Sequence, residues 1–486
     1  MFRKSAENGG HSTMKSDEYM AFDAMGLADL VAKGEVTTDE ILDAALSVID
    51  ERNPEINAFV TRCDDAARQS ISSGLPDGPL RGVPYALKDL NAHVAGLPNT
   101  NGCGLFADVV SPVDSEFVAR LRRAGMVIVG KTNTPAFGTS PSTEPVLFGP
   151  TRNPWDVSRS AGGSSGGAAA AVASGMLPAA HATDGGGSIR IPAATCGLFG
   201  MKTTRNRVTL SPYAGEGWGG MSVGHAVTRS VRDSALLLDL TSAPCPGDPF
   251  YAPRPERPYL EEVTTEPGRL RIGLLDRPIS QGVEVDPEIL SVLDDVVRLC
   301  EELGHDVTPI EWPEFPVKPQ AVMGVLTGAN IAAAIDDRLA QLGRDEREDD
   351  LDLWMRTLVS QGRAASGADY ARAIAGIHAI GRAVATWMSP FDVLLSPTVA
   401  MLPPAIGVLD PMTPVRDALG SLARLTGFLS VFNATGQPAM SVPLGTSVEG
   451  MPIGMQFVGR FGDESTLFRL AGQLERAQPW PGLAPQ

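Results

Sequence analysis

Two clusters of small residues, each containing serine, are the stretches of this sequence best suited to nucleophilic chemistry. The first, SAGGSSGGAAAAVASG, covers residues 160–175 and includes Ser164 and Ser165. The second, TDGGGSIRIP, covers residues 183–192 and places Ser188 directly after three glycines. Because glycine has no side chain, a glycine-rich backbone can bring its N–H groups close to a ligand. Such N–H groups can stabilise the negative charge that develops on a carbonyl oxygen during attack by a nucleophile. The two clusters therefore indicate a serine hydrolase rather than a flexible Gly/Ser linker.

A serine nucleophile needs a base, and lysine is the residue type that fits best here. Only seven of the 40 basic residues are lysines, so a lysine that ends an apolar stretch stands out. Lys88 follows the apolar residues 83–87 and is the first candidate, and Lys131 and Lys202 are the alternatives. A neutral lysine can act as the base when burial lowers its pKa from about 10.4. Three histidines are interpreted as hydrogen-bonded structural residues: His93, His181 and His225.

Two short motifs match other classes of enzyme, but their contexts argue against both. Residues 125–132, GMVIVGKT, match a phosphate-binding loop, yet the four residues between the glycines favour a strand over a turn. Residues 163–167, GSSGG, match the nucleophile elbow of α/β-hydrolases, with Ser165 as the nucleophile. The preceding residues 156–160 are polar, and the last histidine, His378, lies far from the end of the chain. An esterase acting through Ser165 is therefore kept only as an alternative.

These side chains are expected to be positioned by an α/β fold, because predicted strands and helices alternate along the chain. Helices are predicted over 21–52, 114–124, 168–174, 287–303 and 464–476. Strands are predicted over 83–87, 126–129, 270–275, 391–395, 439–442 and 453–458. Residues 1–19 are expected to form a disordered or poorly ordered tail, and residues 20–486 a single domain. Within that domain, residues 319–388 are expected to be mostly helical, broken near Gly343 and Gly362, and are a candidate cover for the active site.

Composition and charge exclude several function classes. The net charge of −17 opposes binding to a nucleic-acid backbone through bulk electrostatics. The five cysteines are widely spaced and form no CxxC or Cys/His metal pattern, which fits reduced thiols. The N-terminal stretch has no apolar core of a signal peptide, and no apolar run reaches the roughly 18 residues of a membrane span. We expect a cytoplasmic monomer or homodimer with no metal, no cofactor, no nucleic-acid partner and no membrane attachment.

The motifs together resemble the amidase signature family, from about residue 20 to the C-terminus. The core of the resemblance is residues 160–202, which contain both serine clusters. Five further stretches match in order: GVPYALKDL at 82–90, GKTNTPAFG at 130–138, STEPVLFGPTRNPWD at 142–156, FDVLLSPT at 391–398 and GMPIGMQFVG at 450–459. The resemblance implies a large, mixed and twisted central β-sheet covered by helices on both sides.

The resemblance also implies a Ser–cis-Ser–Lys triad. By motif position, Lys88 is the base, Ser164 is the middle serine after a cis peptide bond, and Ser188 is the nucleophile. The implied oxyanion hole consists of the backbone N–H groups of Gly185, Gly186, Gly187 and Ser188. The implied supporting residues are Ser165, Asp184 and Arg190. We expect Asp184 and Arg190 to bridge the glycine-rich turn, and we expect substrate contacts from Thr139, Thr143 and Trp218.

The implied activity is hydrolysis of the C–N bond of carboxamides through an acyl-enzyme on Ser188, with carbamates (urethanes) as further candidate substrates. Residues 183–193, 215–235 and 247–253 are most similar to bacterial amidases related to the hydrolase of the 6-aminohexanoate cyclic dimer, a nylon oligomer. Gly185 departs from the threonine or β-branched residue often found there. The alternative within the family is a component similar to the A subunit of glutamyl-tRNA amidotransferase, which works with partner chains.

Overall fold

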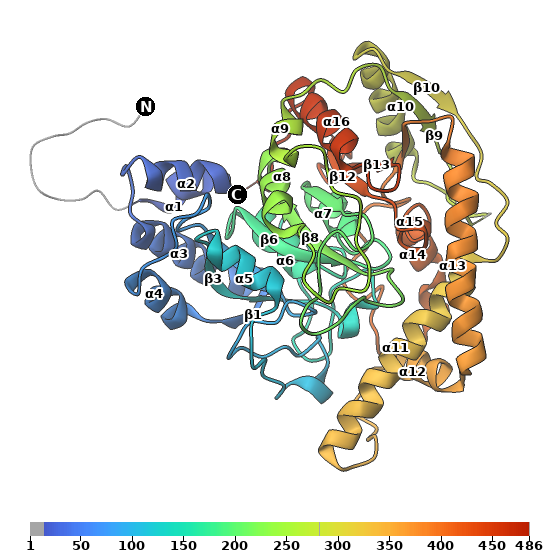
Figure 1. The fold of residues 1–486 in the computed structure, drawn as a ribbon, viewed down its shortest axis with the longest axis horizontal. Coiled ribbons are helices and arrows are strands. Elements are labelled where there is room, and N and C mark those ends of the chain that lie inside the picture. The colour runs from blue at the N-terminus through green and yellow to red at the C-terminus, as the bar shows by residue number, and fades with distance from the viewer. Residues whose placement is uncertain (1–13, 281, 486) are drawn as a thin grey trace, which may run out of the picture.

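A mixed β-sheet of 11 strands runs through the centre of the protein, as the computed structural model shows for residues 14–280 and 282–485 (Figure 1). The strand order is β1-β3-β2-β6-β8-β7-β12-β13-β11-β9-β10. The strands are β1 (Phe59–Arg62), β2 (Pro84–Lys88), β3 (Val127–Thr132), β6 (Ala179–Asp184), β7 (Phe199–Lys202), β8 (Val223–Thr228), β9 (Arg271–Leu274), β10 (Asp306–Pro309), β11 (Val393–Pro397), β12 (Ala439–Thr446) and β13 (Pro452–Gly459). This architecture confirms the predicted α/β class.

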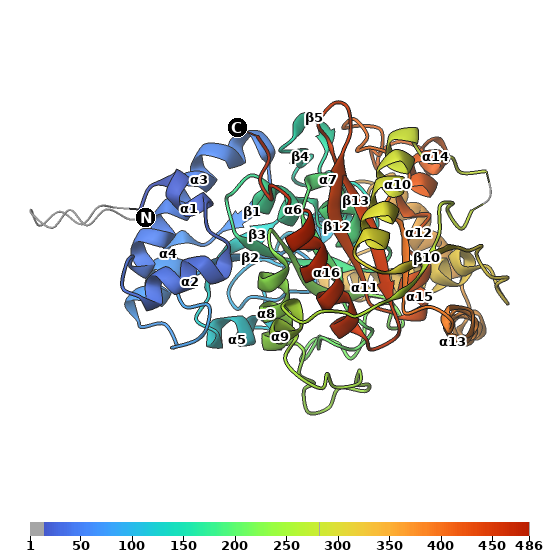
Figure 2. The same ribbon diagram turned by 90° about the horizontal axis from the view of Figure 1, so that it is seen from above.

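The α-helices surround the sheet (Figures 1 and 2). In chain order they are α1 (Ser16–Met20), α2 (Ala24–Ala32), α3 (Thr38–Ile56), α4 (Asp64–Ser72), α5 (Glu116–Arg123), α6 (Gly166–Ala173), α7 (Arg190–Cys196), α8 (Val231–Thr241), α9 (Tyr259–Val263), α10 (Pro287–Glu302), α11 (Pro319–Leu342), α12 (Leu353–Ala364), α13 (Gly367–Met388), α14 (Val415–Thr426), α15 (Val431–Thr435) and α16 (Glu464–Ala477).

Helices lie on both faces of the sheet, as two neighbouring residues of β7 show. The Phe199 ring lies 6.4 Å from the Phe468 ring of α16. A Cβ atom on Gly200, the next residue, would lie 2.6 Å from Ala193 of α7. Because successive strand residues point to opposite faces, α16 and α7 cover opposite sides of the sheet.

The N-terminal segment differs from the prediction. Residues 1–13 of the expected tail lie outside the described residues, but α1 already begins at Ser16. Tyr19 is buried, and its hydroxyl donates to the carbonyl of Met176 at 3.0 Å. The predicted helix over 21–52 is two helices, because the chain turns at Gly34 with φ +67° before α3 begins. A buried aromatic within a short polar stretch is a weak sequence signal, which explains the misplaced boundary.

The two short motifs of other enzyme classes lie in contexts that fit neither class. Residues 127–132 of GMVIVGKT form strand β3, which is fully buried and lies between β1 and β2 in the sheet. The stretch before GSSGG is strand β5 (Asp156–Ser160), which pairs with β4 (Arg152–Asn153) in a small sheet separate from the main one. A nucleophile elbow would instead follow a strand of the main sheet.

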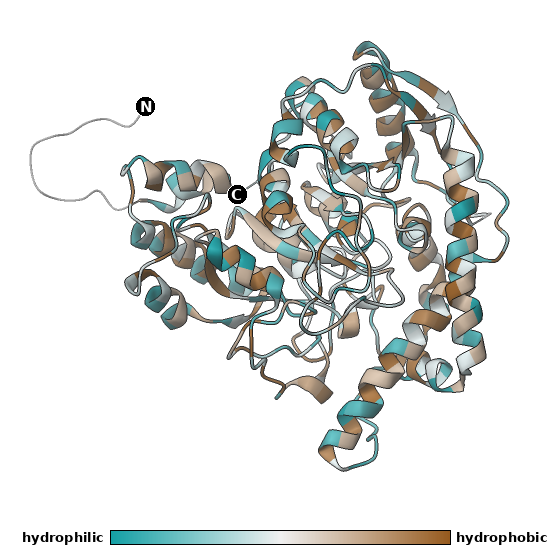
Figure 3. Ribbon diagram, viewed as in Figure 1, coloured by the Kyte–Doolittle hydropathy of each residue, from teal (hydrophilic) through white to brown (hydrophobic). Residues whose placement is uncertain are grey.

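The segment 319–388 is helical as predicted, and it is interrupted near both expected positions. Helix α11 ends at Leu342, and Gly343 follows with φ +61°. Gly362 lies in the last turn of α12, just before the interruption at 365–366, and a Cβ atom there would be 2.0 Å from the carbonyl oxygen of Gly328 in α11. Glycine is therefore needed there for close packing of two helices. Figure 3 shows hydrophilic and hydrophobic segments alternating along α11 and α13, the pattern of helices with one buried face.

No helix among the described residues combines the length and the apolar character that crossing a bilayer requires.

Candidate active site

The central strands bring the two halves of the site to one edge of the sheet. Strands β2 and β6 pair in parallel, with Ala86 opposite Ala180. Lys88 is the last residue of β2, and Asp184 is the last residue of β6. The glycine-rich turn follows β6 directly and leads into α7. In α/β sheets, ligands bind outside the carboxyl ends of such strands.

Lys88 lies in a pocket of hydroxyl groups. Its Nζ atom is 2.7 Å from Ser164 Oγ, 3.0 Å from Ser165 Oγ and 2.9 Å from Thr183 Oγ1. The side chain is completely buried. Burial lowers the pKa of the Lys88 ammonium to about 7, against an opposing effect of the Asp184 charge. A large share of Lys88 is therefore neutral near pH 7 and can accept a proton from Ser164.

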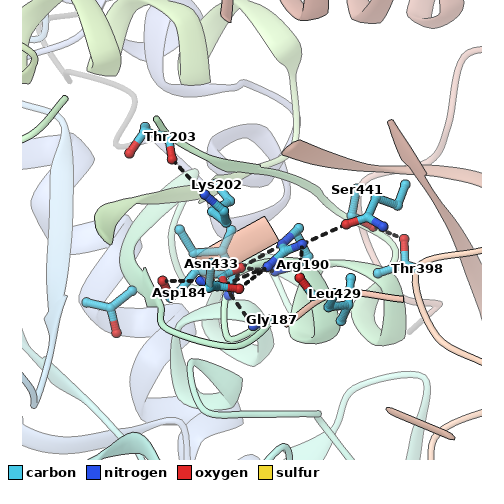
Figure 4. A network of polar contacts seen from close by, with 12 residues as sticks. Asp184, Gly187, Arg190, Lys202, Thr203, Thr398, Leu429, Asn433 and Ser441 are labelled. Carbon is cyan, nitrogen blue, oxygen red and sulfur yellow. Dashed lines mark hydrogen bonds and ion pairs between the residues drawn. The ribbon is translucent and has the colours of Figure 1, made fainter. Parts of the chain in front are cut away.

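The two alternative lysines are engaged elsewhere. Lys131 Nζ donates to the Ala92 carbonyl at 2.8 Å and lies 3.6 Å from the Asp89 carboxylate. Lys202 Nζ donates to the carbonyl of Thr203 at 3.0 Å (Figure 4). Within the described part of the chain, neither ammonium group is hydrogen-bonded to a serine. Of the three candidates, only Lys88 is in direct contact with the serine clusters.

The histidines are held by structural contacts. The Lys88 backbone N–H donates to Nδ1 of His181 at 3.3 Å, and the imidazole packs against Phe117 with 4.8 Å between ring centroids. Burial and the nearby lysine charges keep the pKa of His181 well below its ordinary value. His225 is hydrogen-bonded to Ser234 Oγ at 2.9 Å. His93 stacks on Tyr213 at 3.5 Å but also lines the active-site cavity, a position that the sequence did not reveal.

Asp184 and Arg190 form the ion pair that we expected across the turn. Both side chains are completely buried, and the guanidinium binds both carboxylate oxygens, each at 2.9 Å (Figure 4). Burial raises the pKa of Asp184, but Arg190 and the hydrogen bonds outweigh this effect and hold it well below the usual range. Arg190 also donates to Asn433 Oδ1 at 2.8 Å and to Gln456 Oε1 at 2.6 Å.

We expect Arg190→Ala to lower the free energy of unfolding by about 3–5 kcal/mol, because it leaves the Asp184 carboxylate buried without its cation. Equilibrium denaturation in urea measures this change. Arg269→Ala is the matched control: Arg269 pairs with Asp306 at the surface, where the two side chains are 73% and 47% exposed. Its loss should cost less than about 1 kcal/mol. Equal effects of the two substitutions would contradict a structural role for the buried pair.

The glycine-rich turn differs from the expected oxyanion hole at one position. The Gly187 N–H donates to Asp184 Oδ1 at 2.7 Å and is therefore already occupied. Gly187 has φ +131°, and a Cβ atom there would lie 2.6 Å from Leu429. Within the described residues, the N–H groups of Gly185, Gly186 and Ser188 have no hydrogen-bond partner. These three groups, without Gly187, are the ones available to a ligand.

Ser164 and Ser188 line the same cavity of about 300 Å³. Within the described residues, their side chains are not hydrogen-bonded to each other. The peptide bond between Gly163 and Ser164 is cis. Helix α11 contributes Asn330 and Ile331 to the cavity wall, so the helical segment 319–388 does cover part of the site.

Of the three described residues that we expected to contact the substrate, one lines the cavity and two do not. Trp218 lines the cavity, and a Cβ atom on Gly185 would lie 2.7 Å from its ring. Glycine in place of a β-branched residue therefore makes room for the indole. Thr139 and Thr143 are not among the described residues that line this cavity. Thr143 instead braces the first serine cluster: its hydroxyl donates to the Gly162 carbonyl at 2.9 Å and accepts from the Gly166 N–H at 3.0 Å.

Several contributors to the site were missed by sequence reasoning. Thr183 lies within the second cluster and contacts Lys88. Asn433 donates to the Asp184 carbonyl at 2.9 Å from the distant helix α15. Gln456 belongs to the matched stretch 450–459, which was the available signal for it. In the described part of the chain, no group of three or more His, Cys, Asp or Glu side chains is arranged to hold a metal ion.

Nearly the whole chain is similar in sequence and in structure to known proteins. The model of the family described as Amidase matches residues 40–468. The 6-aminohexanoate-cyclic-dimer hydrolase of Pseudomonas sp. (strain NK87) is 39% identical over 482 residues, covering 96% of each chain. A solved structure of a 6-aminohexanoate cyclic dimer hydrolase with its substrate has a TM-score of 0.90 and 36% identity, covering 96% of this chain and 99% of that one. The crystal structure of a bacterial aryl acylamidase has a TM-score of 0.84 and 28% identity, covering 94% of this chain and 96% of that one.

Proposed function

We propose, from the premise that this chain belongs to the amidase signature family, that it hydrolyses carboxamides through an acyl-enzyme on Ser188. The similarity to named amide hydrolases supports cleavage of an amide C–N bond. The observation that carries the mechanism is the 2.7 Å contact between Lys88 Nζ and Ser164 Oγ, at a cavity that Ser188 also lines.

In the first half of the proposed reaction, Ser188 attacks the amide carbonyl carbon. Neutral Lys88 takes the proton of Ser164 while Ser164 takes that of Ser188. The negative charge on the carbonyl oxygen is stabilised by backbone N–H groups of the turn. The lysine proton then returns through Ser164 to the amide nitrogen. The C–N bond breaks, the amine leaves, and an ester of Ser188 remains.

In the second half, water replaces the amine. Lys88 and Ser164 remove a proton from water as its oxygen attacks the ester carbonyl carbon. The same proton returns to Ser188 Oγ as the ester bond breaks, which releases the carboxylic acid. The three groups are then in their starting protonation states.

The charge of the cavity points to a class of substrate. Glu216 is the only acidic side chain among the described residues that line the cavity. His93 is neutral at pH 7, because burial and the Lys131 charge lower its pKa to about 4. A substrate carrying an ammonium group is therefore favoured over its uncharged analogue. We propose amides of aminoalkanoic acids, linear or cyclic, as substrates, with aryl amides and carbamates as further candidates.

The test is a hydrolysis panel with the purified chain alone. We expect release of p-nitroaniline from 6-aminohexanoyl and hexanoyl p-nitroanilides, with higher kcat/KM for the charged compound. Glu216→Gln should reduce this preference by about 3- to 10-fold, since a partly solvated ion pair contributes about 1 kcal/mol. Glu55→Gln, at an exposed position of α3, should leave it unchanged. The panel also includes the cyclic dimer, phenyl carbamates and esters.

Two results of this panel would contradict the proposal. Inactivity of the folded chain alone on every amide would favour the alternative of a partner-dependent subunit. Hydrolysis of esters without hydrolysis of any amide would favour the esterase alternative. An unchanged preference in Glu216→Gln would overturn the ammonium-binding role and leave amide hydrolysis standing.

A further inference from the structure

A second cavity, of about 650 Å³, lies between the long helix α13 and the residues that follow α15 and β13. Figure 1 shows α13 running along one edge of the molecule, beside α15. The opposite wall comes from Thr435 and Gln437, and from Arg460 and Phe461 at the end of β13. Among the residues described, none of the active-site serines or Lys88 lines it. It is therefore separate from the site proposed for catalysis.

The charged groups of this cavity are all basic. Arg205, Arg382 and Arg460 line it together with His378, and the described lining contains no carboxylate. Arg460 already pairs with Asp392 at 3.1 Å. Arg382 has no ion pair within the described residues. In a protein with a net charge of −17, such a group of cations without lining carboxylates is a local exception.

The hydrogen-bond partners of Arg205 among the described residues are all neutral carbonyls. Its Nε donates to the Gly220 carbonyl at 2.8 Å, and a terminal nitrogen donates to the carbonyls of Asn433 and Ala434 at 3.1 and 2.6 Å. Burial lowers its pKa, and the charge of Glu216 opposes that effect. A guanidinium in this environment gains from an additional anion, because charge-assisted hydrogen bonds are stronger than those to neutral carbonyls.

The remaining wall of the cavity is apolar. Ile377 and Met388 are buried at its floor, and the Phe461 side chain is 49% exposed at its edge. Gln437 is 4% exposed, and among the described residues its amide nitrogen donates only to the Met388 sulfur at 2.9 Å and to the Gly459 carbonyl at 3.5 Å. This buried amide donor thus retains capacity for a better acceptor. The combination suits a ligand with an anionic head and an apolar chain.

We propose that this cavity binds a monocarboxylate with an apolar chain, whose carboxylate pairs with Arg382 and Arg205 and whose chain packs against Phe461 and Ile377. Arg205 connects this cavity to the catalytic site, because it donates to the carbonyls of Gly220 and Asn433. Gly220 lies two residues after Trp218, and the Asn433 side chain donates to the Asp184 carboxylate at 2.9 Å. A carboxylate that draws Arg205 away from these carbonyls therefore lowers turnover without competing with the substrate.

Isothermal titration of the full-length chain with hexanoate and decanoate tests the binding site. We expect both to bind, decanoate more tightly, and hexanamide and hexylamine to bind at least tenfold more weakly than hexanoate. Arg382→Ala should weaken carboxylate binding at least tenfold. Arg372→Ala, on an exposed part of the same helix, should leave it unchanged. A further arm with 6-aminohexanoate distinguishes an acid product of the proposed reaction from a free fatty acid as the source of the ligand.

The same titration with Ser188→Ala separates this proposal from the proposed function, because binding at α13 should persist when catalysis does not. Steady-state kinetics of the unmodified enzyme should show noncompetitive inhibition by decanoate, relieved by Arg382→Ala. Equal binding of hexanoate and hexanamide, or carboxylate binding that Arg382→Ala does not change, would overturn the site. Purely competitive inhibition would place the carboxylate in the catalytic cavity and overturn the coupling.

Discussion

Ser188→Ala is expected to lower kcat/KM for amides by about 10⁴- to 10⁶-fold, the loss typical of removing a serine nucleophile. The substitution should leave the fold intact, since Ser188 is 9% exposed and its hydroxyl has no hydrogen-bond partner among the described residues. Cleavage of a p-nitroanilide by the purified variant measures the effect. Thermal unfolding of the same preparation verifies that the protein is folded.

Ser165→Ala is the matched control for this substitution. Ser165 Oγ receives a hydrogen bond from Lys88 Nζ and donates to the Thr183 carbonyl at 3.2 Å, which are the contacts of a supporting residue. We expect a loss well below that of Ser188→Ala. The reverse ranking would make Ser165 the nucleophile and would replace the proposed mechanism with the esterase alternative.

The second large effect concerns Lys88 and the pH dependence of the reaction. The base must be neutral, and burial lowers its pKa to about 7. We therefore expect kcat/KM to be constant above this pH and to fall about tenfold for each pH unit below it, as for a single ionisation of the free enzyme. Lys88→Ala should lower kcat/KM by about 10²- to 10⁴-fold and abolish this dependence.

Lys202 provides the control for this assignment, because burial lowers its pKa to about 7 as well. Lys202→Met removes that ionisation without touching the serine clusters. If the acidic limb survives in Lys202→Met and disappears in Lys88→Ala, Lys88 is the titrating base. Loss of the acidic limb of the pH profile in Lys202→Met would contradict the proton relay through Lys88.

The residues proposed for catalysis stand out in the sequence because each is marked locally. Lys88 ends an apolar strand, and Ser164 and Ser188 lie in glycine-rich stretches that have no use as ordinary core. The alternation of apolar segments likewise predicted the α/β class. That the second cluster meets Lys88 follows from the parallel pairing of β2 with β6, which brings the ends of the two strands together.

The parts that sequence reasoning missed depend on contacts between distant segments. Asn433 lies 249 residues from Asp184, and no local pattern shows that its amide meets that carboxylate. Thr143 was expected at the substrate and instead braces the first serine cluster. The Gly187 N–H is taken by Asp184, which becomes evident only once the turn is folded.

Covalent labelling tests the central claim most directly. A fluorophosphonate reacts with an activated serine, and mass spectrometry of the digested protein locates the adduct. The proposed mechanism predicts a single adduct on Ser188, absent from Ser188→Ala and formed more slowly as the pH falls below about 7. An adduct on Ser165, or one that persists in Ser188→Ala, would contradict it.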